Sequence, residues 1–344
     1  MKILIPAYEP IVNLIDLIEE LKKLTDIPII VVNDGSNEKY DEIFELLKSK
    51  NIIVLNHKQN KGKGEAIKTG IKYLIESNEN QGCVCADADG QHTAKDILRV
   101  CEEMEQSQKD IVLGVRNFKE KNIPFRSKFG NNMSKLLFYI MTGEKIVDTQ
   151  TGLRGYSSEI FKWLLNVDGS RYEYEFNILL NLKEENITYT QIDIETIYED
   201  KNEVSHFRPI RDSILIYKPV CKFLISSILS AVIDFTLLLI FQYAIKNLLL
   251  SVIFSRILSS LFNFIFNKNY VFNVKKDKNN IEMVLKYYTL VIIIMILNYL
   301  ILNLLYTFVG INLIIAKLIT EIVLYFFSFI VQKRVIFKNR REKE

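Results

Sequence analysis

The chain has 344 residues, which at roughly 150 residues per domain predicts two domains. Hydrophobic residues make up 49% of it and charged residues 25%, and the long apolar runs of the second half exclude a purely soluble protein. The 13 glycines, 6 prolines and 11% aromatic residues exclude a disordered or collagen-like chain. A net charge of +3 gives no whole-chain basic field, so we expect no nucleic-acid partner.

Short β-branched segments alternate with amphipathic segments in the first half of the chain. The pattern predicts strands at 3–5, 27–32, 52–55, 82–86 and 110–115, and helices at 12–24, 40–50, 63–76 and 94–105. Such alternation predicts an α/β fold, with a Rossmann-like, mainly parallel sheet covered on both faces. Ligands of these sheets bind beyond the carboxyl ends of the strands. The residues that follow each strand are therefore the candidates for chemistry.

Acidic and polar residues follow three of these strands. Residues 6–9 are Pro-Ala-Tyr-Glu, residues 33–36 are Asn-Asp-Gly-Ser, and residues 87–92 are Asp-Ala-Asp-Gly-Gln-His. Asp87 and Asp89 are two residues apart, so their carboxylates can point the same way and repel unless a cation lies between them. Two carboxylates and the Gln91 amide suit Mg²⁺ or Mn²⁺ better than zinc. A simple Asp-Gly turn is the alternative interpretation.

A glycine segment at 60–64, Asn-Lys-Gly-Lys-Gly, precedes the helix predicted at 63–76. It is similar to a phosphate-binding loop that opens a helix. It is not Gly-x-Gly-x-x-Gly, because Ile67 occupies the position of the third glycine. The segment therefore argues against a dinucleotide-binding domain.

Together these motifs resemble those of the family 2 glycosyltransferases with a GT-A fold. The resemblance covers residues 1–217 and is strongest to polyprenyl-phosphate sugar transferases of the dolichol-phosphate mannose synthase and bactoprenol glucosyltransferase type. It implies that Asp34 contacts the nucleotide base, that Asp87 contacts the ribose or diphosphate, and that Asp89 and Gln91 hold the metal. Residues 148–156, Asp-Thr-Gln-Thr-Gly-Leu-Arg-Gly-Tyr, match a family segment beside the donor sugar, and residues 205–211 resemble a loop that closes over the donor phosphates.

The resemblance thus implies a set of site residues. Asp87, Asp89, Arg116 and Arg126 are the catalytic candidates, and Arg116 and Arg126 also contact the acceptor phosphate. The candidates for binding the nucleotide sugar are Pro6, Tyr8, Glu9, Asp34, Ser36, Lys63, Asp87, Ala88, Asp148, Arg154, Ser205 and Arg208. Arginine suits phosphate because its planar fork matches phosphate oxygens. One of Glu173 and Glu175 is expected near the acceptor, although an ion-paired helix start is the alternative.

Apolar side chains recur every three or four residues from Phe125 to Ile140, opposite polar ones that include Arg126. This spacing predicts an amphipathic helix. Its apolar face either packs on the protein core or lies on a membrane surface with Arg126 toward a lipid phosphate. The residues leave both interpretations open.

Four apolar stretches, at 220–243, 248–266, 284–309 and 311–332, each have about the ~20 residues needed to cross a bilayer. Residues 262–272 resemble residues 327–337, which predicts two related hairpins. This half, residues 218–344, resembles the GtrA family of small four-span proteins. Four charged residues fall inside the spans, and either an ion pair or a path for lipid headgroups would account for them: Asp234, Arg256, Lys317 and Glu321.

Lysines and arginines concentrate between the second and third stretches and after the fourth. The positive-inside rule then places both termini and the catalytic domain on the cytoplasmic face of a multi-pass membrane protein.

The sequence therefore predicts a membrane-bound, metal-dependent, inverting transferase. It would move a hexose from GDP-mannose or UDP-glucose to a polyprenyl phosphate, whose phosphate needs no strong base to attack. The alternatives are a lipid-linked-sugar flippase or assembly factor with a degraded transferase domain, and a processive polysaccharide synthase. The latter carries Gln-x-x-Arg-Trp, whereas the single tryptophan here, Trp163, follows Lys162. The donor, the length of the polyprenol and assembly into a homo-oligomer stay open.

Overall fold

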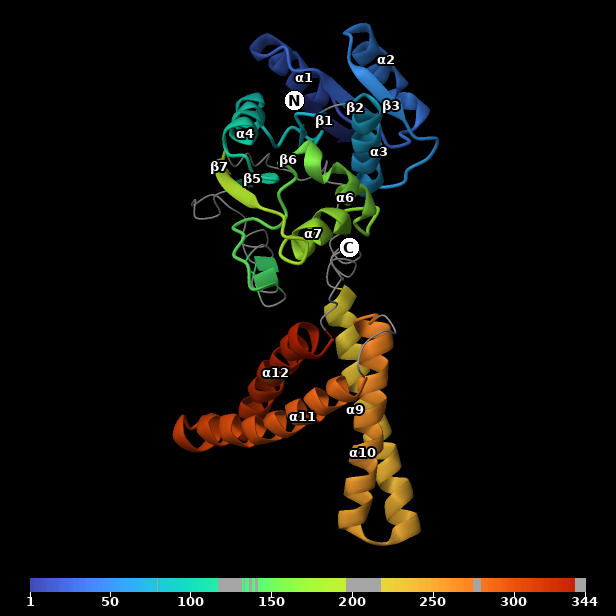
Figure 1. The fold of residues 1–344 in the computed structure, drawn as a ribbon, viewed down its shortest axis with the longest axis vertical. Helices are drawn as coiled ribbons and strands as arrows, with labels where there is room; N and C mark the ends of the chain where they lie inside the picture. The colour runs from blue at the N-terminus through green and yellow to red at the C-terminus, as the bar shows by residue number, and fades with distance from the viewer. Residues whose placement is uncertain are drawn as a thin grey trace. The chain divides into compact units, whose positions relative to one another are not determined.

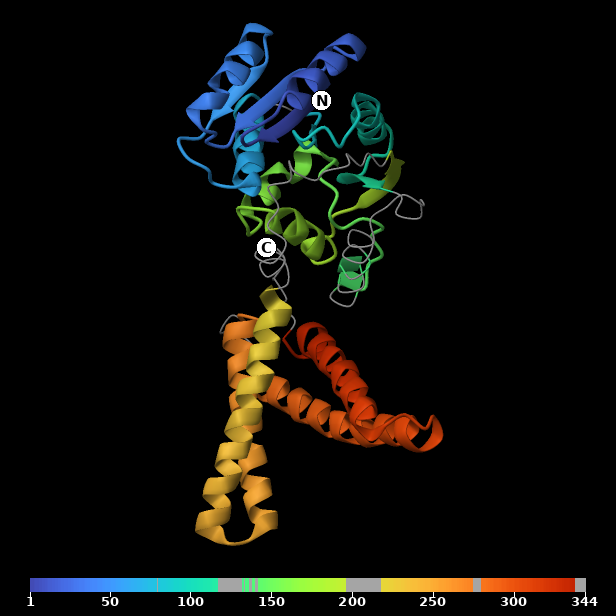
Figure 2. The ribbon, with the colours of Figure 1, turned by 180° about the vertical axis from the view of Figure 1, so that it is seen from behind.

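The computed structural model describes residues 1–78, 80–116, 132, 134, 135, 138, 139, 142–195, 218–274 and 280–337. The chain divides into two compact units, Met1–Ile216 and Tyr217–Glu344. Figures 1 and 2 show the ribbon of both units from opposite sides. The first unit contains a sheet covered by helices, and the second is helical.

The first unit is built on a seven-stranded sheet with the order β3-β2-β1-β4-β6-β5-β7. All neighbouring strands pair in parallel except β6, which is antiparallel to both β4 and β5. The prediction of a mainly parallel α/β sheet is confirmed. The strands are β1 Lys2–Ala7, β2 Ile29–Asn33, β3 Ile53–Asn56, β4 Cys83–Cys85, β5 Ile111–Arg116, β6 Arg154–Tyr156 and β7 Tyr189–Ile194.

Helices cover both faces of this sheet (Figure 1). Side chains of α1, α2 and α4 form one core with alternate strand residues such as Ile3, Ile5 and Val31. On the other face α3 lies so close to β1 that a Cβ at Gly70 would meet the Leu4 side chain. The helices of this unit are α1 Asn13–Leu24, η1 Glu38–Tyr40, α2 Asp41–Ser49, α3 Lys63–Glu76, α4 Ala94–Gln106, η2 Ser158–Ile160, α6 Phe161–Asn166 and α7 Glu173–Asn181.

The segment predicted as an amphipathic helix between 125 and 140 lies largely outside the described residues. Within its described part, Phe138 is buried and its ring packs edge-on against Phe176, with 5.8 Å between ring centroids. Ser134 is buried as well and shares a hydrogen bond with Thr149. This part of the segment packs on the protein core.

The second unit contains four helices long and apolar enough to cross a membrane, at 220–245, 248–271, 280–308 and 313–336. The four spans predicted from the sequence are thus found as continuous helices. Short π-helical turns extend three of them at their carboxyl ends. The elements are α9 Lys218–Ile245, α10 Leu248–Phe266, η3 Asn267–Val271, α11 Asn280–Asn303, η4 Leu304–Phe308, α12 Leu313–Val331 and η5 Gln332–Ile336.

The first hairpin, α9 and α10, meets the second, α11 and α12, where the two similar segments 262–272 and 327–337 lie (Figures 1 and 2). The contacts occur in matched pairs. Phe264 packs on Phe337 at 5.6 Å between centroids, and Phe272 packs on Phe329 at 5.9 Å. The amide of Asn267 donates to Gln332 Oε1 at 2.9 Å, which joins equivalent positions of the two segments. We call this contact region the seam.

The four charged residues inside the spans pair within their own hairpins. Arg256 lies 3.4 Å from Asp234, and Ser259 donates to the same carboxylate at 2.8 Å. Lys317 lies 2.7 Å from Glu321, one turn away on α12. These contacts are ion pairs, which is one of the two roles that the sequence analysis allowed for the charged residues.

Candidate functional site

The candidate site lies at the carboxyl ends of β1, β2 and β4. The chain continues from β1 to β2 on one side, and β4 flanks β1 on the other, so the strand order reverses between β1 and β4. Crevices at such switch points are where open α/β sheets bind ligands. Pro6 is buried next to Ala7, the last residue of β1, and half-buried Tyr8 and Glu9 follow the strand.

The Glu9 backbone holds the first two strand ends together. Its N–H donates to the Ser36 hydroxyl at 2.8 Å, although Glu9 and Ser36 are 27 residues apart. Glu9 has a φ of 48°, a left-handed conformation that few residues other than glycine adopt. Strained backbone of this kind concentrates at functional sites because the surrounding contacts hold it in place.

Asp34, directly after β2, organises the loop between β3 and α3. Its buried carboxylate accepts hydrogen bonds from the backbone N–H groups of Lys61 and Gly62 at 2.9 and 2.7 Å. The Asn60 side chain donates to it at 3.1 Å, and His57 Nδ1 lies 2.6 Å away. Asp34 thus fixes the segment that opens α3.

Lys63, the first residue of α3, brings two carboxylates together. Its ammonium lies 2.5 Å from Asp87 Oδ1 and 2.8 Å from Glu175 Oε2 on α7. Burial on its own would lower the pKa of Lys63, but Asp87 and Glu175 raise it well above its usual value. Burial would likewise raise the pKa of Asp87, but Lys63 and His92 outweigh burial and hold that pKa far below its usual range. The result is a largely buried, charged cluster at the end of β4.

Asp89 occupies the turn beyond Asp87. Its Oδ1 accepts a hydrogen bond from the Gln91 N–H at 3.0 Å. Burial and the neighbouring Asp87 charge raise the pKa of Asp89. Buried His92 places Nε2 3.6 Å from Asp87 Oδ2, and neither of its ring nitrogens has a hydrogen bond to a described residue. This end of the site carries more negative than positive charge.

The residues present fit a hard divalent cation. Among the described residues, no group of three or more His, Cys, Asp or Glu side chains is arranged to hold a metal ion. A site here would therefore use the two carboxylates of Asp87 and Asp89 with the Gln91 amide and other oxygens, a set that Mg²⁺ and Mn²⁺ accept when substrate and water complete it. A cation bound there would relieve the repulsion between the two carboxylates.

Gly152 makes room for Asp87. A Cβ built at Gly152 would lie 2.0 Å from Asp87 Oδ2 and 2.5 Å from its Cγ. Residues 148–156, which resemble the family segment beside the donor sugar, thus approach Asp87 through a glycine, which has no side chain. Any larger residue at 152 would displace the carboxylate.

Arg116, the last residue of β5, is held by Asp148. The guanidinium donates from Nε to Asp148 Oδ2 at 2.7 Å and from a terminal nitrogen to Oδ1 at 3.3 Å. Asp148 is fully buried, whereas the Arg116 side chain is 20% exposed. Two parallel bonds of this kind fix the plane of a guanidinium, so Asp148 acts on the site through Arg116.

Arg154 lies inside the protein, with 1% of its surface exposed. It donates to the backbone carbonyls of Thr151 and Glu175 at 2.8 and 2.7 Å. Burial on its own would lower the pKa of Arg154, but Tyr156 and Glu175 raise it. Arg154 therefore ties β6 to α7 and positions Glu175.

The structure distinguishes the contacts of Glu173 from those of Glu175 and adds one residue, His57, to the site. Of the two glutamates, Glu175 faces Lys63, whereas Glu173 accepts hydrogen bonds from the Ser170 and Arg171 N–H groups. The sequence analysis did not single out His57, which directly follows β3 and could have been found by the same strand-end rule. His57 links Asp34 to Thr69, whose hydroxyl lies 2.8 Å from Nε2.

Three predicted site residues, Arg126, Ser205 and Arg208, lie outside the described residues. Ala88 lies half-buried between the two aspartates. Among the described residues, Lys63, Asp87 and Glu175 form one group and Arg116 and Asp148 another, while Asp34 contacts the loop that precedes Lys63.

Comparison with known proteins shows which families the two halves of the chain match. Residues 2–165 match the family Glycosyl transferase family 2, and residues 222–337 match the family GtrA/DPMS, transmembrane domain. The UDP-N-acetylglucosamine–dolichyl-phosphate N-acetylglucosaminyltransferase of Methanococcus voltae is 30% identical over 216 residues, which are 58% of this chain and 86% of that protein. The dolichyl-phosphate beta-glucosyltransferase of Dictyostelium discoideum is 25% identical over 230 residues, 60% of this chain and 69% of that protein.

Among solved structures, glucosyl-3-phosphoglycerate synthase from Mycobacterium tuberculosis superimposes with a TM-score of 0.48 and 15% identity, covering 65% of this chain and 77% of that one. The sequence relatives and the two matched families establish what kind of protein this is, and they confirm the resemblance drawn from its motifs. The chain is an integral membrane glycosyltransferase of family 2, with a GT-A-like domain followed by a GtrA/DPMS transmembrane domain.

Proposed function

We propose that this protein transfers a hexose from a nucleotide diphosphate sugar to a polyprenyl phosphate, with inversion at the anomeric carbon. The observation that carries the proposal is the cluster of Lys63, Asp87 and Glu175 at the switch point of the sheet, with Asp89 beside it. Relatives named as dolichyl-phosphate glycosyltransferases support the choice of acceptor. Residues 1–217 are the catalytic domain in this proposal, and residues 218–344 are the membrane domain.

A divalent ion, Mg²⁺ or Mn²⁺, is the cofactor that the donor set favours, held by Asp87, Asp89 and Gln91. When bound, it would supply Lewis-acid stabilisation of the departing diphosphate. The nucleotide sugar otherwise meets two carboxylates, which would repel it.

The strand ends bind the donor in this proposal. Residues 6–9 and Ser36 line one side, and the half-buried Lys63 offers its ammonium to phosphate oxygens. Asp34 and Arg154 act indirectly, as positioning residues, because buried hydrogen bonds already occupy both side chains. Asp34 positions the loop that precedes Lys63, and Arg154 positions Glu175. We place Ser205 and Arg208 at the donor phosphates by their match to the family loop.

The acceptor phosphate is assigned to Arg116, with Arg126 as its partner. The bidentate pair with Asp148 orients the Arg116 guanidinium before any ligand binds, which lowers the entropy lost on binding. Asp148 is thus a positioning residue. A planar guanidinium matches the oxygens of a phosphate monoester.

The chemical step needs no proton transfer. An oxygen of the acceptor phosphate forms a bond to the anomeric carbon while the bond from that carbon to the nucleoside diphosphate breaks, and the diphosphate leaves with the electron pair. A phosphate monoester has its second pKa near ~6 and is mostly dianionic at neutral pH. A sugar hydroxyl would instead need a general base.

The basic residues that follow the second and fourth spans favour a cytoplasmic location for the catalytic domain and both termini. Labelling of single cysteines placed at each terminus, with an impermeant maleimide in inverted and right-side-out vesicles, tests that orientation.

The activity is tested on the full chain in membranes. UDP-glucose, UDP-N-acetylglucosamine and GDP-mannose are each supplied with and without undecaprenyl phosphate, and nucleotide diphosphate release is measured before and after EDTA. We expect one donor to release its nucleoside diphosphate, and this release should require both the lipid and an added divalent ion. Release that is independent of the lipid, or no release with any donor, contradicts the proposal.

A further inference from the structure

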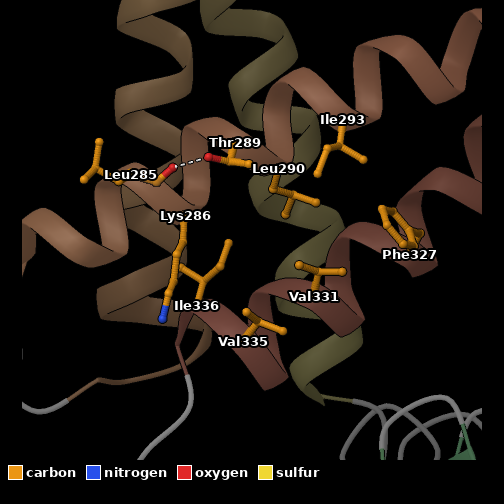
Figure 3. Close-up of a pocket in the computed structure, with 9 residues that line it drawn as sticks. All are labelled: Leu285, Lys286, Thr289, Leu290, Ile293, Phe327, Val331, Val335 and Ile336. Carbon is orange, nitrogen blue, oxygen red and sulfur yellow. Dashed lines mark hydrogen bonds between the residues drawn. The ribbon is translucent and has the colours of Figure 1, made fainter.

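A groove of about 320 Å³ lies between α11 and the end of α12 in the second hairpin (Figure 3). Leu290 and Ile293 line it from α11, and Phe327, Val331 and Val335 line it from α12 and η5. Lys286 stands at one end, with its ammonium directed away from the apolar lining in Figure 3. The groove is thus mainly apolar, with a lysine at one end.

The first hairpin provides an internal comparison, because its equivalent face has a different content. The equivalence is structural as well as sequential. Phe223 packs on Phe329 at 5.4 Å between centroids, and Tyr287 packs on Phe264 at 5.3 Å, both edge-on. Because Phe329 and Phe264 are equivalent, Phe223 of α9 corresponds to Tyr287 of α11. Lys222 and Lys286, which directly precede these two residues, therefore correspond to each other.

Aromatic rings occupy this face of the first hairpin. Phe262, Phe266 and Tyr270 follow one another along α10 and η3, with 5.5 and 4.9 Å between successive centroids. Lys222 lies over the Tyr270 ring at 4.3 Å and donates to the Tyr270 carbonyl at 3.0 Å. The Tyr270 ring and the Lys222 side chain thus contact each other.

In the second hairpin, valines replace two of these three rings. The alignment of 262–272 with 327–337 sets Val331 against Phe266 and Val335 against Tyr270, while Phe327 keeps the first ring. Each exchange of an aromatic ring for valine removes bulk from the helix surface. The groove of the second hairpin thus lies where two of the three rings are replaced by smaller side chains.

We propose that this groove binds the isoprenoid chain of the polyprenyl phosphate acceptor, with the phosphate toward the end marked by Lys286. The inference rests on the proposed function and deepens it by naming where the chain of that acceptor lies. A groove in a membrane helix pair is filled by hydrocarbon, and branched aliphatic walls pack well against a methyl-branched chain.

Polarity sets the direction of the chain. Lys286 is six residues from the start of α11 at Asn280, or about 9 Å along the helix, and a lysine stem at this depth extends its ammonium toward the membrane surface. Its partner Glu282, at 2.5 Å, lies one turn nearer that surface. The headgroup is placed at this polar end, because the opposite end of the groove has no charged group among its lining residues.

The test fills the groove with the residues of the first hairpin, in the double variant Val331→Phe and Val335→Tyr of the full chain. The KM is measured for undecaprenyl phosphate and for geranyl phosphate, whose chain is too short to run along the groove. We expect the ratio of the first KM to the second to rise about fivefold or more, since sites discriminate strongly on apolar volume. The matched control, Val232→Phe with Val252→Tyr, adds the same side chains on exposed positions of α9 and α10 and should leave the ratio unchanged.

A direct measurement guards against misfolding of the variant. A photoreactive undecaprenyl phosphate should label the parent protein within the peptide that carries Leu290 and Ile293, and filling the groove should remove the label. Three outcomes overturn the proposal: an unchanged KM ratio, labelling elsewhere, or loss of a cross-linked dimer on filling, which would assign the groove to a second copy. If the parent protein uses neither lipid, the proposed function itself fails.

Discussion

The two units of this protein bury polar groups in different ways. In the catalytic unit, full charges are gathered at one edge of the sheet, where Lys63 holds Asp87 and Glu175 within 2.8 Å. In the membrane unit, the seam is joined by neutral groups, with Asn267 bonded to Gln332 and Tyr287 bonded to Asn263. The charged residues of the spans instead pair inside single hairpins.

The difference follows from the cost of removing a charge from water. Breaking a buried ion pair by removing one partner costs about 3–5 kcal/mol, whereas hydrogen bonds between membrane helices average about 0.6 kcal/mol. A cluster that concentrates so much electrostatic free energy suits a site that must bind a charged donor. A neutral seam suits a joint that only holds two hairpins together.

The largest effect is expected at the acidic strand end. Asp89→Ala removes a carboxylate from the proposed metal site, and we expect kcat to fall about a thousandfold, the equivalent of about 4 kcal/mol of lost transition-state stabilisation. Asp26→Ala, at an exposed position, is the control and should keep its activity. Steady-state transfer rates over a range of Mn²⁺ concentrations provide the measurement. Activity of Asp89→Ala near that of the parent would defeat the metal assignment.

Lys63→Met should lower stability as well as donor binding, because it leaves half-buried Asp87 and buried Glu175 as close carboxylates without their shared cation. We expect the free energy of unfolding of the catalytic unit to fall by about 3 kcal/mol. Trp163, the single tryptophan of the chain, lies on α6 in this unit, so its fluorescence reports the unfolding in the full chain.

Two variants sharpen that measurement. Lys72→Met removes an exposed lysine from α3, the helix that carries Lys63, and should leave the midpoint of unfolding unchanged. Adding Glu175→Gln to Lys63→Met removes one of the two stranded charges and should recover part of the loss. A double variant less stable than Lys63→Met would show that the cluster is not held by charge.

Gly152→Ala tests the close approach of residues 148–156 to Asp87 at the end of β4. The new methyl group would lie 2.0 Å from Asp87 Oδ2, and since that atom ends a side chain, the carboxylate should rotate away while the fold persists. We expect kcat to fall about a hundredfold, as for other misplaced electrostatic groups. Gly155→Ala, whose methyl group meets Met104, should lower the unfolding midpoint without a comparable fall in kcat.

The sequence predicted much of this arrangement because strand ends are local signals. Asp34, Asp87 and Asp89 follow strands whose β-branched pattern is clear, and parallel strands bring their carboxyl ends to one edge. The order of the strands is a different matter. The antiparallel β6 has three residues, one of them Gly155, and its short, unpatterned sequence gives no sign that it inserts between β4 and β5.

Partners of the site residues were harder to predict than the residues themselves. Lys63 and Glu175 are 112 residues apart, and their contact depends on how α3 packs on α7. The burial of Arg154 has the same origin, because only the fold shows that its guanidinium points into the protein and reaches the Glu175 carbonyl. Sequence spacing predicts which groups share a strand end, but long-range packing decides which of them contact the ligand.

The smallest effect is expected at the seam. Asn267→Leu removes the bonds from its amide to Asn263 and Gln332, both at 2.9 Å, and we expect a loss of about 1 kcal/mol in the association of the hairpins. Cysteines at Phe272 and Phe337, whose rings stack at 5.2 Å between centroids, report that association through the rate of disulfide formation. Asn303→Leu, which removes an acceptor bonded to Thr307 on the same helical stretch, is the control. A slower rate for Asn267→Leu than for Asn303→Leu would show that neutral amides hold the hairpins together, whereas equal rates would contradict that role.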